Sequence, residues 1–174
     1  MLEALQYEFM QNALISGILI SIAAGIIGSL IVVNRLTFLA GGIAHSSYGG
    51  IGIAIYFGLP VLFGATVFAV LTAVIIAIIT LNNRNRIDSI IGLMWAFGMA
   101  IGIIFIDITP GYNVDLMSYL FGSIIAVSSG DVMYMTLLDI FIISVVTVFY
   151  KQILAVSYDS EFAKLRGIDT EFFY

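Results

Sequence analysis

The chain has 174 residues, of which 61% are hydrophobic and 10% are charged, and its formal net charge is −5. Soluble domains carry charge on about 25% of their residues, so this composition excludes a soluble globular domain of any size. The absence of cysteine excludes a disulfide framework, a thiolate metal site and a cysteine nucleophile. The chain has room for roughly five or six membrane spans of about 20 residues each.

The N-terminus lacks the pattern of a secretory signal, because it carries Glu3 and Glu8 in place of a basic segment and has no small-residue cleavage site. Long apolar runs lie at residues 9–33, 38–57, 61–81, 90–106 and 132–150. Runs of this length predict transmembrane helices. We therefore expect an all-α polytopic membrane protein with a single transmembrane domain over residues 1–174.

Basic residues indicate the orientation of the spans. All of them lie at span boundaries or in the C-terminal tail: Arg35, Arg84, Arg86, Lys151, Lys164 and Arg166. Lys and Arg favour the cytoplasmic side of a membrane. This predicts cytoplasmic loops after the first and third spans, a cytoplasmic C-terminal tail and an N-terminus outside.

A shorter apolar run at residues 116–127 lies between the last two spans. If it crossed the membrane, the basic tail would be placed outside. As a helix it would extend only about 18 Å, against about 30 Å of hydrocarbon. We therefore expect a re-entrant or interfacial half-helix that enters from the outer side, in addition to five spans.

Small residues recur every four positions in three of the spans, and such stripes let membrane helices approach closely. They are Gly17, Ser21, Gly25 and Ser29 in the first span, Gly42, Ser46, Gly50 and Ala54 in the second, and Gly92, Ala96 and Ala100 in the fourth. The stripes are either packing seams or smooth surfaces along which helices slide between two states.

Two ionisable residues lie within predicted spans. His45, the single histidine, lies about two turns into the second span, and Asp139 lies in the last span. Intramembrane ionisable groups usually face a cavity or a partner, and imidazole with carboxylate suits a divalent cation. The alternative for each is a hydrogen bond to Ser or Tyr, or for Asp139 a subunit interface.

Three aspartates lie near the predicted outer surface, with no basic residue in the outer loops to neutralise them: Asp107, Asp115 and Asp131. They predict either a vestibule that attracts cations or ordinary solvated helix ends. No second histidine completes a metalloprotease pair, and the glycines do not form a phosphate-binding loop between strand and helix. The pattern disfavours an intramembrane enzyme.

Residues 157–167 are predicted to form a short helix whose terminal residues stabilise it. Its parts are an N-cap (Ser157), an acidic first turn (Asp159 and Glu161), a basic last turn (Lys164 and Arg166) and a left-handed stop (Gly167). A charged helix this short beside a membrane span indicates a soluble partner that binds it.

Five motifs in chain order resemble those of the membrane permease subunits of the zinc/manganese/iron ATP-binding-cassette importers. They lie at residues 10–17 with 25–29, 38–50, 91–102, 114–124 and 158–168. The stretch 114–124 is the most specific, and residues 158–168 resemble the coupling helix of that family.

The resemblance implies a homodimeric permease in the cell membrane of a prokaryote, with a metal path at or near the subunit interface. It implies a metal-binding protein outside and ATPase subunits inside, with no nucleic acid, no resident cofactor and no enzymatic activity in this chain. The divalent metal (zinc, manganese or iron) is the cargo. The residues implied to couple to the ATPase are Asp159, Glu161, Phe162, Ala163, Arg166 and Gly167.

The sequence departs from this family at two places. The family usually has an aspartate four residues before the histidine, where this chain has Gly41, so that either the site is weaker, with Asp139 or an outer carboxylate as a substitute, or metal passage is impaired. Members of the family also usually continue for roughly three more spans. We therefore expect a truncated or split permease. The alternatives are a fragment that acts only as an assembly scaffold, and a channel or secondary transporter that uses His45 and Asp139 without ATP.

Overall fold

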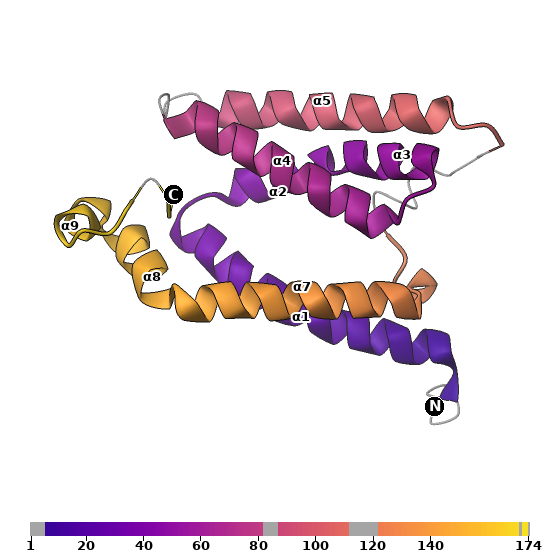
Figure 1. Ribbon diagram of the computed structural model, residues 1–174, viewed down its shortest axis with the longest axis horizontal. Coiled ribbons are helices and arrows are strands. Elements are labelled where there is room, and N and C mark those ends of the chain that lie inside the picture. The colour runs from indigo at the N-terminus through magenta and orange to yellow at the C-terminus, as the bar shows by residue number, and fades with distance from the viewer. Residues whose placement is uncertain (1–5, 82–86, 112–121, 171, 174) are drawn as a thin grey trace. The chain divides into compact units, whose positions relative to one another are not determined.

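A computed structural model describes residues 6–81, 87–111, 122–170 and 172–173 (Figure 1). The regular elements in these ranges are α1 (Glu8–Val33), α2 (Thr37–Ser46), α3 (Tyr48–Phe57), α4 (Val61–Leu81), α5 (Ile87–Asp107), the 3₁₀ turn η3 (Ile124–Ala126), α7 (Ser129–Val148), α8 (Tyr150–Tyr158) and α9 (Ser160–Leu165). The chain divides into two compact units. Unit 1 comprises Met1–Arg35 and Ser123–Tyr174, and unit 2 comprises Leu36–Gly122.

The helices confirm the predicted all-α fold and its five spans. Those long and apolar enough to cross a membrane are Glu8–Val33, Thr37–Phe57, Val61–Thr80, Ile87–Asp107 and Ser129–Val148. At 1.5 Å per residue each covers about 30 Å or more, the thickness of the hydrocarbon core. The second span combines α2 and α3, which are joined by Ser47 in a near-helical conformation (φ −58°, ψ −17°). The irregularity at Ser47 was not predicted.

Unit 2 is held together by close contact between helix backbones. A Cβ atom on Gly52 of α3 would lie 2.5 Å from the carbonyl oxygen of Gly102 in α5, and one on Gly98 would lie 2.6 Å from Cα of Ser46. On the other side of α3, a Cβ on Gly50 would overlap the carbonyl of Gly64 in α4. Lipid provides no hydrophobic drive between helices, so this close approach supplies the contact area that holds them.

The predicted small-residue stripes have different outcomes in unit 2. The stripe of the second span is a packing seam, because all its members are buried. The stripe predicted on the fourth span does not form a seam within unit 2, because Ala96 and Ala100 are exposed. The buried face of α5 instead consists of Ile91, Gly98, Gly102 and Ile106. The alanines lie on another face of the same helix, away from the glycines that meet the second span.

The stripe of the first span does not form a seam within unit 1. Ser21, Gly25 and Ser29 are exposed, and a Cβ on Gly25 would meet nothing within 4 Å. The serine hydroxyls donate to their own helix, to the carbonyls of Gly17 (2.6 Å) and Ile26 (2.8 Å).

In unit 1, α1 and α7 run parallel and side by side (Figure 1). Near their starts, the Asn12 amide donates to the Ser129 hydroxyl (3.2 Å), which in turn donates to the Glu8 carboxylate (2.7 Å). Beyond their ends, the Asn34 amide donates to the Ser157 hydroxyl of α8 (3.0 Å). The start of α7 therefore lies beside the start of α1.

The sequence predicted that residues 116–127 form a half-helix that makes no net crossing of the membrane, and this stays a prediction. Of that predicted half-helix, residues 116–121 lie outside the described part, and the described remainder holds only the 3₁₀ turn Ile124–Ala126.

The glycine contacts of α5 predict opposite effects for two Gly→Ala changes on this helix. Gly102→Ala is expected to lower the free energy of unfolding by about 1–3 kcal/mol, because the new methyl group overlaps the Tyr48 backbone. Gly92→Ala meets nothing within 4 Å and is expected to be neutral or to stabilise by up to about 1 kcal/mol through helix propensity. Thermal unfolding of both variants in detergent measures the difference, and equal melting temperatures would contradict the close-packing argument.

Candidate metal path and coupling segment

His45 lies in the last turn of α2 and stacks on Trp95 of α5. The ring centroids are 4.3 Å apart and the ring planes differ by 4°. Among the described residues, neither imidazole nitrogen has a hydrogen-bond partner, so the alternative of a hydrogen bond to Ser or Tyr is not what the structure shows. Trp95 and its stack were not predicted from the sequence.

The surroundings of His45 leave one neighbouring position open and one polar group buried. Gly41 lies one turn earlier on the same helix, and a Cβ there would meet nothing within 4 Å. Tyr48, one turn later, is only 3% exposed, and its hydroxyl has no partner among the described residues. Tyr48 was not predicted as a residue of the site. Its place three residues after His45, about one helical turn away, could have indicated it.

Asp139 lies in the seam between α1 and α7. Buried or half-buried positions recur with helical spacing on α1 (12, 16, 19, 23, 26 and 30) and on α7 (132, 135, 139, 142 and 146). Asp139 is 7% exposed, and its buried Oδ2 has no hydrogen-bond partner among the described residues. Because Asn12 pairs with Ser129, Asp139 lies level with residues 19–23 of α1. The one polar side chain in that stretch is Ser21, and its hydroxyl already donates to the Gly17 carbonyl of its own helix.

His45 and Asp139 belong to different units, so their pairing in one site stays a prediction. No group of three or more His, Cys, Asp or Glu residues that could hold a metal ion occurs within residues 6–81, 87–111, 122–170 and 172–173. The described residues therefore contain candidate single ligands, and no preformed metal cage is found among them.

The three aspartates of the predicted vestibule have separate surroundings. Asp131 completes a capping box at the start of α7, where its Oδ2 accepts from the Ser128 backbone (3.0 Å) and hydroxyl (2.7 Å). Asp107 is exposed at the end of α5, and Asp115 lies outside the described residues. For Asp131 the structure supports the helix-end alternative, and the vestibule stays a prediction.

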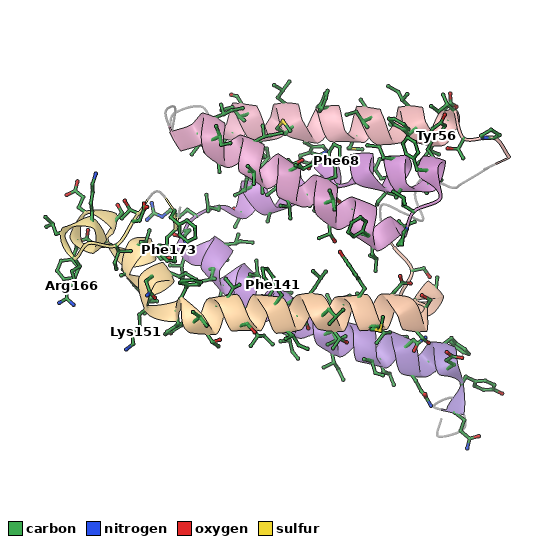
Figure 2. All side chains as sticks on the ribbon, in the orientation of Figure 1. Tyr56, Phe68, Phe141, Lys151, Arg166 and Phe173 are labelled. Carbon is green, nitrogen blue, oxygen red and sulfur yellow. The ribbon has the colours of Figure 1, made fainter. Side chains whose placement is uncertain are left out.

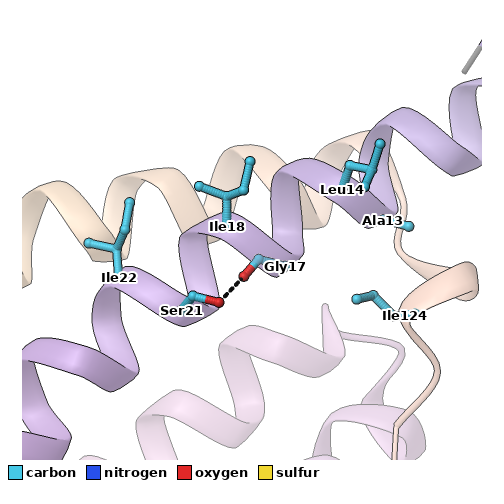
Figure 3. A pocket seen from close by; sticks show the side chains of 7 residues that line it. All are labelled: Ala13, Leu14, Gly17, Ile18, Ser21, Ile22 and Ile124. Carbon is cyan, nitrogen blue, oxygen red and sulfur yellow. Dashed lines mark hydrogen bonds between the residues drawn. The ribbon is translucent and has the colours of Figure 1, made fainter.

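A depression of ≈ 580 Å³ runs along α1, where Ile124 of η3 approaches Gly17 (Figure 3). It is lined by Ala13, Leu14, Gly17, Ile18, Ser21, Ile22 and Ile124. These side chains offer no carboxylate or imidazole, and the Ser21 hydroxyl is bonded to Gly17. The depression has no chemistry for holding a metal ion.

The C-terminal segment forms two short helices, because α8 continues through Tyr158 before the chain turns at Asp159 (φ −152°, ψ 96°). The Asp159 carboxylate accepts from the Phe162 backbone N–H at 2.9 Å and so caps α9. The predicted N-cap, Ser157, is therefore wrong: it lies inside α8, and its hydroxyl accepts from Asn34. The predicted left-handed stop is confirmed at Gly167 (φ 78°).

The residues predicted to couple to an ATPase surround one turn of α9. Ala163 is fully buried, while Leu165 is 87% exposed. The Arg166 guanidinium lies 5.0 Å from the centre of the Phe162 ring, and Arg166 and Lys151 are labelled in Figure 2. An open groove of ≈ 350 Å³ between α8 and α9 is lined by Lys151, Leu154, Ala155, Tyr158, Asp159 and Phe162. The segment presents apolar and charged groups together on a capped turn.

Five apolar helices that carry isolated polar residues, followed by a charged capped helix, define a polytopic membrane protein. Residues 6–174 match the ABC 3 transport family. The chain belongs to this family, which confirms the resemblance drawn from its motifs.

Several relatives show how far the likeness extends. A membrane protein of Synechocystis sp. is 47% identical over 174 residues, which is the whole of this chain and 62% of the relative. A probable metal transport system membrane protein of Chlamydia trachomatis is 41% identical and covers 88% of this chain and 55% of its own length. The manganese transport system membrane protein MntC of Listeria monocytogenes is 32% identical over 98% of this chain and 60% of its own length.

A solved structure, PsaBC from Streptococcus pneumoniae in complex with Fab, matches with a TM-score of 0.79 and 31% identity. The match covers 99% of this chain and 62% of that chain. The chain thus spans about 55–62% of the length of these relatives. The Chlamydia and Listeria relatives are named as membrane proteins of transport systems, in agreement with the expected class of non-enzymatic subunit.

Two aspartates of α7 are predicted to affect stability in opposite directions. Asp139→Leu is expected to raise the free energy of unfolding by about 1–3 kcal/mol, because it removes a buried acceptor without a partner. Asp131→Leu is expected to lower it by about 0.5–2 kcal/mol, because it breaks the capping box. Thermal unfolding in detergent compares them, and destabilisation by Asp139→Leu would show that this carboxyl has a partner in the folded protein.

Proposed function

We propose that the chain forms the membrane permease part of an ATP-driven importer of a divalent transition-metal ion. The observation that carries the proposal is the family match over residues 6–174, which includes all five spans. Relatives named for metal transport, and in several cases for manganese transport, support a metal as the cargo. Manganese is the first ion to test, followed by zinc and iron(II).

His45 is proposed as a ligand of the ion in transit. Neutral imidazole is a common ligand of transition metals, and an ionisable group inside a span usually serves a path or a partner. Asp139 is the second proposed residue of the path, although its place in the α1–α7 seam favours a structural position. Asp107, Asp115 and Asp131 are proposed to attract cations at the outer mouth.

The C-terminal segment is proposed to bind the ATPase on the cytoplasmic side. A six-residue helix is too short to be stable alone, and here its N-cap, left-handed stop and buried Ala163 fix it against α8. An extracytoplasmic metal-binding protein and a second copy of the permease complete the proposed assembly. The cell membrane of a prokaryote, with the N-terminus outside, is the proposed location.

Metal uptake tests the proposed cargo and ligand. Cells without other manganese uptake that express this chain with its ATPase and binding protein are expected to accumulate manganese in an ATP-dependent way. His45→Ala is expected to reduce uptake at least tenfold, and Gly41→Asp to lower the half-saturating metal concentration, since a carboxylate one turn away adds a ligand. Uptake that does not depend on ATP would favour a channel, and no uptake by the wild type would favour the scaffold alternative.

The coupling role of α9 is tested by a charge reversal with a matched control. Glu161→Arg places a cation in the first turn of α9 and is expected to separate ATP hydrolysis from transport without reducing membrane insertion. Asp88→Arg makes the same charge reversal in the first turn of α5, outside this segment, and is expected to retain coupling. ATPase activity and uptake are measured together in reconstituted vesicles. Normal coupling of Glu161→Arg would remove the proposed role of this segment.

A further inference from the structure

Trp95, the single tryptophan of the chain, is fixed from several directions. Its indole N–H donates to the Met99 sulfur (2.9 Å), one turn along α5. Its ring lies between two aromatic residues of α2, with centroids 4.3 Å from His45 and 6.4 Å from Phe38. These two residues are seven apart, so they share a face of α2, and Trp95 spans about two turns of that face.

This contact depends on the close packing of the second span against α5. The Gly98 backbone approaches Ser46, one residue after His45, and the Ile91 side chain fills the space beside Gly42. Trp95 lies between these two contact points on α5. The packing that holds the helices together therefore also sets the height and rotation of the indole relative to the imidazole.

The stack supplies what a hydrogen bond usually supplies at a ligating histidine. In metal proteins the second ring nitrogen normally donates to a carboxylate, a carbonyl or a water molecule, and this bond fixes the orientation of the ring. Neither nitrogen of His45 has such a partner among the described residues. The parallel indole instead restrains both side-chain torsions, because rotation of the imidazole would break the ring contact.

Stacking is compatible with binding of an ion. Metals bind an imidazole through a nitrogen lone pair, which lies in the plane of the ring, whereas Trp95 covers one face of the ring. With the planes 4° apart, the indole leaves both nitrogen directions open in the ring plane.

We propose that Trp95 is the positioning residue of the metal path, which holds the His45 imidazole in one orientation so that an entering divalent ion meets a preorganised ligand. The inference rests on the proposed function, since it takes His45 as a metal ligand. Preorganisation improves binding by reducing the ordering cost that accompanies it. The interaction free energy of an aromatic pair corresponds to a factor of roughly 2–12 in a binding constant.

The experiment uses the full chain in detergent micelles, purified with a tag that contains no histidine, so that His45 is the one imidazole in the sample. Zn²⁺ is the diamagnetic probe for NMR of the ring-labelled histidine, and Mn²⁺ affinity is measured by equilibrium dialysis. The variants are Trp95→Leu and Trp95→Phe. Phe97→Leu is the matched control, because Phe97 is an exposed aromatic residue two positions away on α5.

Trp95→Leu is expected to weaken Mn²⁺ binding by roughly 2–12-fold and to remove the upfield ring-current shift of the His45 ring protons. Trp95→Phe, which keeps a stacking ring but loses the bond to Met99, is expected to fall between the wild type and Trp95→Leu. Phe97→Leu is expected to match the wild type in both measurements. In a variant whose circular dichroism matches the wild type, loss of the ring-current shift reports loss of the stack, whereas a general loss of stability would also change the dichroism.

Unchanged affinity in Trp95→Leu, with binding abolished by His45→Ala, would overturn the positioning role and leave the proposed function intact. Wild-type binding that is absent, or unaffected by His45→Ala, would overturn both, and the ring-current shift would still report whether the stack exists. If circular dichroism shows that Trp95→Leu does not fold, Trp95→Phe decides: wild-type affinity in that variant overturns the proposal.

Discussion

The close contact of glycine backbones between the second, third and fourth spans is the constraint on which unit 2 depends. Between membrane helices, association relies on van der Waals contact and interhelical hydrogen bonds. Gly50, Gly52 and Gly98 each bring a helix backbone within reach of another. At this separation the helices have little freedom to slide or rotate, so side chains next to the contact are held in register. His45 and Trp95 are such neighbours, since each lies within one turn of the contact between Ser46 and Gly98.

Unit 1 is built differently, with polar contacts at the two ends of its helix pair. Asn12 and Asn34 each bond across to the α7–α8 side, while the seam between them is mainly apolar. A carboxyl group in such a seam is costly in lipid, and Asp139 has no partner there among the described residues. A residue of a metal path must be accessible to the ion, whereas Asp139 is buried in the seam.

Patterns of hydrophobicity and charge predicted the spans and the left-handed stop at Gly167, since each depends on residues close together in the chain. The stack of His45 on Trp95 could not be predicted, because it depends on the register of two helices. For the same reason, the sequence did not show that the alanine stripe of α5 lies away from the second span: spacing identifies a face of small residues but not the helix that packs on it. The prediction of Ser157 as the N-cap was wrong because the preceding helix, α8, continues through Tyr158. The N-cap of α9 is therefore Asp159.

Because Gly41 supplies no ligand beside His45, the stack on Trp95 matters more for the proposed path. A carboxylate one turn before His45 would add a second ligand and, through its charge, attract the ion; Gly41 supplies neither. An ion in transit must be able to leave its site again. Such a site should therefore have few ligands, and those ligands should already be in place when the ion arrives. A single imidazole that is already oriented meets both conditions, because few bonds must break when the ion leaves and no side chain must be ordered when it arrives. In the proposed path, the close packing of unit 2 at its glycines would take over part of the role that an additional ligand would have.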